Sequence, residues 1–233
     1  HYPLRRQRQM CIRDSGDSLN APYGTKSVDE IRDLTFAIVD KLLKLGIKGL
    51  AVACNTATSA AVRQLRIMYP DLTIVGIEPA IKPAVESNHG GEILVMATPM
   101  TIKQEKFNRL LDIYKDRAKI IPVSCKGLME FVEHGNLNGS FLEAYFNETL
   151  VPYLNDTTET IVLGCTHYPF LRPYLKEFLG ERRIQIIDGS HGTSCELKRQ
   201  LAGKKLLQKE NHEGKVVIKN SMDEPETVSY THL

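Results

Sequence analysis

The sequence predicts an α/β fold of two similar lobes, each a mainly parallel sheet flanked by helices, with the active site in the cleft between them. Short apolar runs alternate with stretches of helical periodicity, which is the pattern of βαβ units. Two Cys-centred segments, 53–56 and 164–167, each follow an apolar run and lead into a helical stretch. Open α/β sheets bind ligands at that edge, so the two segments mark equivalent points of two related lobes.

The elements of the first lobe follow from local signals. Ser27 and Glu30 form a capping box, which starts a helix that Gly46 ends. Further along, we expect strands over 48–53 and 73–76 and a helix over 56–69. The chain is then expected to cross to the second lobe near 77–79.

The second lobe follows the same alternation. We expect strands over 92–96, 119–123, 160–163 and 184–187, and helices over 79–87, 101–114, 126–134, 140–154 and 168–179. A return crossover near 188–189 sends a helix over 190–201 back to the first lobe. The first lobe then comprises residues 16–78 and 188–227, and the second comprises 79–187.

The composition is that of an ordinary globular protein. The chain has 233 residues, 42% of them hydrophobic and 25% charged, with a net charge of +2. No apolar stretch approaches the roughly 20 residues of a membrane helix, and the charge balance gives no reason to expect a nucleic-acid partner. The five cysteines show no regular spacing, which favours a reducing, cytoplasmic compartment over a disulfide framework.

The two ends differ from the rest of the chain. Residues 1–14 are strongly basic and lack periodicity, and residues 5–14 can be encoded by a sequence that resembles a sequencing-library adapter. The codons of 228–233 can match the reverse complement of part of that adapter. We therefore expect residues 1–15 and 228–233 to be adapter-derived and to lie outside the fold, and Cys11 to carry no function.

Cys54 and Cys165 are the candidate catalytic residues. The N-terminus of a helix stabilises a thiolate, and each of these thiols precedes a predicted helix. Two thiols on opposite sides of a carbon acid would invert its configuration, because one removes the proton and the other delivers a proton to the opposite face. The polar residues beside them could hold a small anion's carboxylates and amine: Asn55, Thr56, Thr166 and His167.

Packing is the alternative role for each cysteine. A free Cys after an apolar strand is more often buried than catalytic, but two in equivalent positions with polar neighbours favour catalysis. Cys125 and Cys195 lack such neighbours, so burial is the better interpretation for them. His167 is either a structural histidine or the partner that tunes Cys165.

Three segments resemble those of bacterial glutamate racemases: Cys54-Asn55-Thr56-Ala57-Thr58, Gly164-Cys165-Thr166-His167-Tyr168-Pro169, and residues 16–24. The resemblance extends from about Gly16 to Leu201. It implies that the protein interconverts L- and D-glutamate with no cofactor and no metal, supplying D-glutamate for peptidoglycan. It is also compatible with a homodimer.

The resemblance also assigns roles to residues. Cys54 and Cys165 would be the acid/base residues, and Glu133 would support His167 and Cys165 as part of the catalytic set. The substrate would bind to Tyr23, Gly24, Asn55, Thr56, Thr98, Thr101, Thr166 and His167. From the sequence alone, Glu133 could equally be a surface residue of a helix. Tyr23 and Gly24 could equally form only a turn.

One departure from the family pattern stands out. The family opens with a strand and an Asp-Ser-Gly-x-Gly-Gly loop, whose Asp assists the first Cys and whose Ser binds substrate. Asp14-Ser15-Gly16 looks like its start, but no Gly-Gly follows, and we interpret the match as a coincidence. We therefore expect a first lobe without a central strand, a Cys54 without its Asp, and a chain of low stability and low activity.

Two other functions remain open at this stage. An aspartate racemase or another amino-acid racemase of the superfamily would share the same thiols, and a substrate panel would separate it. A glutamate-binding protein without catalysis would bind the amino acid but would not exchange its α-proton with solvent.

Overall fold

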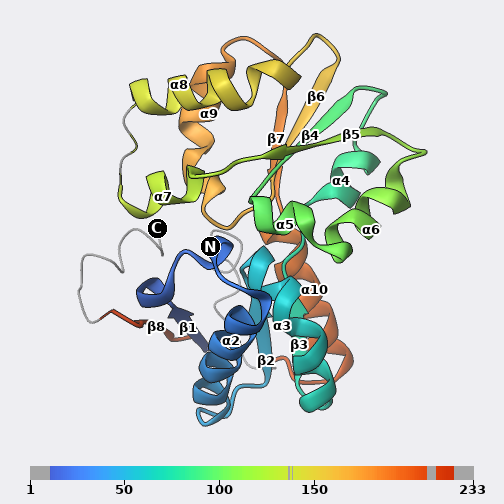
Figure 1. Cartoon of the computed structure of the whole chain (residues 1–233). Coiled ribbons are helices and arrows are strands. Elements are labelled where there is room, and N and C mark those ends of the chain that lie inside the picture. The colour runs from blue at the N-terminus through green and yellow to red at the C-terminus, as the bar shows by residue number, and fades with distance from the viewer. Residues whose placement is uncertain (1–10, 136, 138, 209–213, 223–233) are drawn as a thin grey trace. The chain divides into compact units, whose positions relative to one another are not determined.

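The computed structural model describes residues 11–135, 137, 139–208 and 214–222 (Figure 1). It confirms the α/β fold. The chain divides into two compact units, which we call unit 1 (His1–Ile77 with Ser190–Leu233) and unit 2 (Glu78–Gly189). Among the described residues, no helix has both the length and the apolar character needed to cross a membrane.

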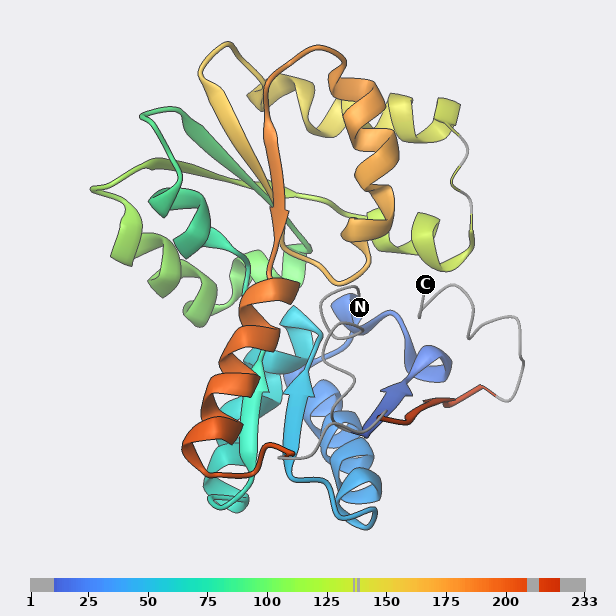
Figure 2. The same cartoon turned by 180° about the vertical axis from the view of Figure 1, so that it is seen from behind.

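Unit 2 is built on a four-stranded parallel sheet in the order β5-β4-β6-β7. The strands are β4 (Glu92–Ala97), β5 (Lys119–Ser124), β6 (Thr158–Leu163) and β7 (Gln185–Asp188). Every residue of β4 is buried, because helices cover both faces of the sheet (Figures 1 and 2). Leu94 and Met96 pack on one face, whereas Ile93 and Val95 pack on the other.

The helices of unit 2 fall into two sets. Helices α7 (Leu128–Glu133), α8 (Gly139–Thr149) and α9 (Arg172–Leu179) contribute to the core that holds Leu94 and Met96. Helices α4 (Ile81–Glu86) and α6 (Glu105–Tyr114) contribute to the core on the other face. The short α5 (Pro99–Lys103), η3 (Val151–Tyr153) and η4 (Tyr168–Leu171) complete the unit.

Three helices expected in unit 2 are interrupted. The helix expected over 101–114 is two helices, because Gln104 adopts an extended conformation with ψ of 136°. The helix expected over 140–154 ends at Thr149, and Pro152 follows in η3. The stretch 168–179 begins as the 3-10 turn η4, which carries Pro169 in its first turn. Proline lacks the N–H that a continuing α-helix would use.

Unit 1 contains α2 (Val28–Leu43), β2 (Gly49–Val52), α3 (Asn55–Met68), β3 (Thr73–Gly76) and α10 (Ser190–Gly203). The expected capping box is present. Ser27 Oγ accepts from the Glu30 N–H at 3.3 Å, and Glu30 Oε2 accepts from the Ser27 N–H at 2.9 Å. Gly46 follows the end of α2 with a φ of 71°, a conformation that favours glycine.

Two strands of unit 1 were not predicted. β1 (Ile12–Gly16) pairs in parallel with β8 (Val216–Asn220), although we expected residues before Gly16 to lie outside the fold. Unit 1 therefore holds two separate two-stranded sheets, β1-β8 and β2-β3, rather than the single sheet expected for this lobe. The two sheets stay separate because no described strand lies between the β1-β8 pair and the β2-β3 pair and hydrogen-bonds to both.

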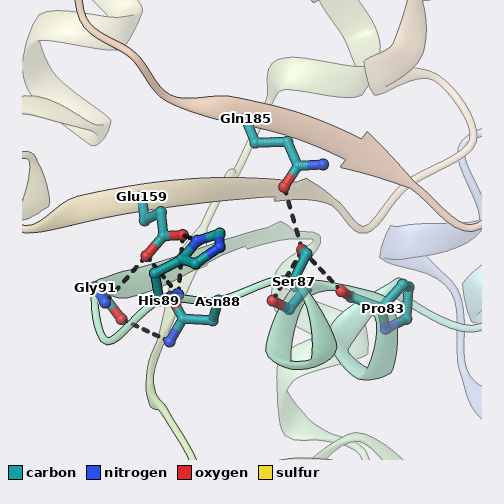
Figure 3. Close-up of polar contacts among 8 residues, drawn as sticks. Pro83, Ser87, Asn88, His89, Gly91, Glu159 and Gln185 are labelled. Carbon is teal, nitrogen blue, oxygen red and sulfur yellow. Dashed lines mark hydrogen bonds and ion pairs between the residues drawn. The ribbon is translucent and has the colours of Figure 1, made fainter.

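A carboxylate fixes the loop between α4 and β4 (Figure 3). Both oxygens of Glu159 accept from the His89 N–H at 3.0 Å, and Oε2 also accepts from the Gly91 N–H at 3.1 Å. His89 Nδ1 lies 2.6 Å from Glu159 Oε1. These hydrogen bonds, with His89 the largest contributor, lower the pKa of Glu159. The loop is thus held by the ionised carboxylate.

Glu159→Gln is expected to destabilise the protein by about 1–2 kcal/mol at pH 7, because the amide loses the charged acceptor. A carboxyl whose pKa is depressed by folding contributes stability above its ordinary pKa of 4.5 and loses it as the pH falls. The deficit should therefore shrink between pH 5 and pH 3, roughly, as measured by urea unfolding. Glu148→Gln on the exposed side of α8 is the matched control, and an equal deficit in both variants would contradict the prediction.

Candidate active site

Cys54 stands where unit 1 turns from strand β2 into helix α3. It is the N-cap residue of α3, and its carbonyl accepts from the Thr58 N–H at 2.8 Å. The first N–H groups of a helix have no intrahelical partner, and the N-terminus carries a partial positive charge. The strand-to-helix turn expected at this thiol is therefore present, and an anion at this position would be stabilised.

Asn55 and Thr56 follow the thiol and are both buried. Asn55 Oδ1 has no hydrogen-bond partner among the described residues. A buried acceptor left unpaired costs about 1–3 kcal/mol. An ammonium donor of a bound amino acid would remove that cost, so this oxygen is suited to recognise the substrate's amine.

We call Cys54, Asn55 and Thr56 the half-site of unit 1, and Tyr23 contributes its hydroxyl group to it. The Tyr23 hydroxyl donates to Asp17 Oδ2 at 2.6 Å, and Asn20 Nδ2 donates to Asp17 Oδ1 at 2.9 Å. Burial, the Asp17 hydrogen bond and the charges of Asp17 and Cys54 raise the pKa of Tyr23 above its usual range. The phenol is therefore a neutral donor close enough to Cys54 to respond to its charge. Gly24 follows in η2 (Tyr23–Thr25).

Sequence reasoning missed two groups that hold this segment. Asp17 is the carboxylate that fixes Tyr23, and the Asp17-x-x-Asn20 spacing was the only local signal for it. Asn220 lies at the end of β8, and its Oδ1 accepts from the Ser18 N–H at 3.2 Å. Its Nδ2 also donates to Ser18 Oγ at 2.9 Å. The segment around Tyr23 is thus tied to a strand that was not predicted.

In unit 2, Cys165 follows β6 at the carboxyl end of the sheet. Gly164 precedes it and donates its N–H to the Met96 carbonyl at 2.7 Å. A Cβ at position 164 would lie 2.6 Å from that carbonyl oxygen, so only glycine allows this close approach. Glycine thus seats the Cys165 loop directly against the central strand β4.

Cys165, His167 and Glu133 form a relay in which the His167 ring lies between the thiol and the carboxylate. Cys165 Sγ lies 3.6 Å from His167 Nδ1, and His167 Nε2 lies 2.5 Å from Glu133 Oε1. Glu133 is the last residue of α7, which places its carboxylate beside the Cys165 loop. Of the two interpretations left open for Glu133, the structure favours the one in which it contacts His167.

The charges in this relay are coupled. Burial alone would lower the pKa of His167, but hydrogen bonds to Cys165 and Glu133 and their charges outweigh it and raise the pKa to about 10. The hydrogen bond from His167 in turn lowers the pKa of Glu133. At neutral pH the pair is therefore an imidazolium and a carboxylate, and both ring nitrogens carry a proton.

Hydroxyl groups lie at the same edge of the sheet of unit 2. Thr98 is the N-cap of α5, and its Oγ1 accepts from the Thr101 N–H at 3.2 Å and lies 3.0 Å from Thr101 Oγ1. Both threonines are buried just after β4, which pairs with the strand that carries Cys165. Thr166 directly follows Cys165 in its loop. Unit 2 therefore brings together all of its predicted site residues at one sheet edge.

Burial was expected for Cys125 and Cys195, and the structure buries only one of them. Cys125 is buried as expected, and burial raises the pKa of its thiol to about 12. For Cys195 the expectation of burial is wrong, because it lies on the exposed side of α10, whose buried residue is Leu201. Among the described residues, no group of three or more His, Cys, Asp or Glu side chains could hold a metal ion.

The sequence matches a known protein family and curated relatives. The family model described as Asp/Glu/Hydantoin racemase matches residues 9–191. The chain belongs to this racemase family. The glutamate racemase of Clostridium botulinum (strain Langeland) is 50% identical over 217 residues, covering 93% of this chain and 84% of that protein. The glutamate racemase of Clostridium novyi (strain NT) is 50% identical over 213 residues, covering 91% and 82%.

Solved structures agree with the sequence relatives. Glutamate racemase isoform RacE1 from Bacillus anthracis is similar with a TM-score of 0.85 at 29% identity, covering 97% of this chain and 84% of that one. The Thermus thermophilus glutamate racemase in complex with β-chloro-D-alanine gives a TM-score of 0.79 at 25% identity, covering 100% and 87%. The resemblance seen in the sequence motifs is therefore confirmed.

Proposed function

We propose that this protein is an isomerase that interconverts L- and D-glutamate and so supplies D-glutamate for peptidoglycan. The observation that carries the proposal is the Cys165–His167–Glu133 relay in a racemase-family chain. The 50% identity to curated glutamate racemases supports glutamate as the substrate.

Two thiols can perform the reaction without a cofactor. The thiolate of one cysteine takes the α-proton, which breaks the C–H bond and forms an S–H bond while the electron pair stays on the α-carbon. The thiol of the other cysteine then gives its proton to the opposite face of that carbon. The roles of Cys54 and Cys165 are exchanged after each inversion, so the same pair serves both directions.

The other residues of the two half-sites bind and orient the amino acid. Asn55 Oδ1, buried and unpaired within the described chain, accepts from the α-ammonium. One hydroxyl of the Thr98–Thr101 pair and the hydroxyl of Thr166, with the first N–H groups of α3, donate to the carboxylates. Tyr23 and Gly24 close the substrate site beside Cys54. His167 holds its positive charge next to the Cys165 sulfur and so stabilises the thiolate there.

Solvent exchange tests the function directly. We expect L-glutamate in deuterated water to lose its α-proton signal in NMR spectra and its circular dichroism at matching rates. High protein concentration is appropriate, since the sequence predicts low turnover. Aspartate in parallel distinguishes a racemase of another specificity, because faster exchange with aspartate would reassign the substrate. Saturable glutamate binding without α-deuteration would instead indicate a binding protein.

We also propose a cellular compartment and an oligomeric state for this protein. All five cysteines are free, which supports a reducing compartment such as the cytoplasm. We further propose a homodimer, which light scattering of the purified protein would test by its mass in solution. A mass near the 26.2 kDa of one chain would contradict it.

A further inference from the structure

His191 and Cys195 form an exposed pair on helix α10. The two residues are four positions apart, so their side chains lie on one face of the helix. Cys195 Sγ lies 3.5 Å from His191 Nε2, and both residues are exposed. Because both belong to a single helix, this geometry does not depend on how the two units of the chain are placed.

The spacing of the two atoms matches one edge of a tetrahedral metal site. Zinc binds thiolate sulfur at about 2.3 Å and imidazole nitrogen at about 2.0–2.1 Å, and a tetrahedral angle then separates the two ligands by about 3.5–3.6 Å. The separation of 3.5 Å between Sγ and Nε2 is that distance. No rearrangement of the helix is needed for both atoms to contact one ion.

We propose that His191 and Cys195 bind a transition-metal ion of the Zn²⁺ class, with water completing the coordination. A thiolate and an imidazole select such ions over Mg²⁺ and Ca²⁺, which prefer oxygen ligands. The nearest carboxylate in sequence, that of Glu196, is engaged by Arg199 Nε at 2.7 Å and by Gln200 Nε2 at 2.7 Å. The protein therefore supplies two ligands, and the site is open to solvent.

The binding step has a definite proton balance. The Cys195 S–H bond breaks, its proton goes to solvent, and the sulfur forms a bond to the metal in place of one water molecule. The imidazole binds through its unprotonated Nε2 and displaces a second water molecule. Binding is thus accompanied by proton release, and neither of the proposed catalytic thiols takes part.

Residue-resolved alkylation tests the site in the full chain. Iodoacetamide labelling is followed by peptide mass mapping, so that Cys195 is read separately from every other thiol. Zn²⁺ at ten times its dissociation constant should slow labelling of Cys195 about tenfold, because roughly one tenth of the sites stay metal-free. Mg²⁺ should have no effect, and exposed Cys11 serves as the internal control for the reagent.

Two variants separate metal binding from a simple S–H···N contact. His191→Gln should abolish the protection of Cys195 by Zn²⁺ while leaving its labelling without metal measurable. Co²⁺ should give a thiolate-to-metal charge-transfer absorption with the unmodified protein, and Cys195→Ser should remove it. Circular dichroism checks that both exposed substitutions keep the helix. The absence of protection, or protection that persists in His191→Gln, would overturn the proposal.

Discussion

Replacing either thiol is expected to remove racemisation almost completely. Cys54→Ser and Cys165→Ser should each lower kcat/KM for glutamate about 10³-fold or more, because a serine hydroxyl is far less acidic than a thiol and transfers protons poorly near neutral pH. The loss of optical rotation from L-glutamate and from D-glutamate measures the effect in both directions.

The two variants should also differ from each other in a way that a folding defect cannot imitate. In deuterated water, the cysteine that remains can still exchange the α-proton of one enantiomer without inverting it. Cys54→Ser and Cys165→Ser should therefore exchange opposite enantiomers. Cys195→Ser is the control, because this thiol is exposed on α10 and should leave turnover unchanged. Full racemisation retained in either active-site variant would refute the two-thiol mechanism.

The parts of the fold that sequence predicts best are those specified locally. Continuous apolar runs predicted the buried strands β4 and β6, and the Ser27 box predicted the start of α2 at the correct residue. The break at Gln104 has no such local signal. The β1-β8 pair could not be predicted either, because it joins segments more than 200 residues apart and β1 lacks an apolar run.

The site residues show the same difference between local and distant signals. Cys165 and His167 are two residues apart, so sequence alone brings them together. Glu133 lies 34 residues before His167, so no local pattern links the two; the family resemblance suggested the pair, and the fold brings the carboxylate to the ring. Asp17 and Asn220 were missed because a turn and a distant strand, rather than a motif, place them beside the Tyr23 segment. The local chemistry and the Glu133 pair were therefore predictable, whereas the contacts of Asp17 and Asn220 were not.

Glu133→Gln is expected to shift the titration of His167 and to weaken the protein in a pH-dependent way. The amide cannot supply the negative charge that helps to hold the pKa of His167 at about 10, so this pKa should fall toward the ordinary value of 6.5. Removing a carboxylate from this partly buried pair should cost about 2 kcal/mol of stability at pH 7. NMR titration of the His167 ring and urea unfolding measure the two effects.

The pH window of that cost follows from the direction of each shift. His167 has a raised pKa, so its contribution is full below about 6.5 and is lost as the pH rises through about 10. Glu133 has a lowered pKa, so its contribution is present above the ordinary value of 4.5 and is lost as the pH falls. The stability gap between the two proteins should therefore be largest between about pH 5 and pH 6.5 and should shrink as the pH rises from there toward about 10 or falls below about 4.5.

The activity should also depend on the positive charge of His167. With a neutral imidazole beside it, the Cys165 thiolate loses a stabilising partner, and kcat should fall about 10–100-fold at pH 8 with little change in KM. Glu130→Gln is the matched control, because it removes a carboxylate one turn earlier on α7 that does not hydrogen-bond to His167. If Glu133→Gln leaves the His167 titration unchanged, then Glu133 positions α7 without tuning the relay, and the imidazolium must owe its charge to Cys165 alone.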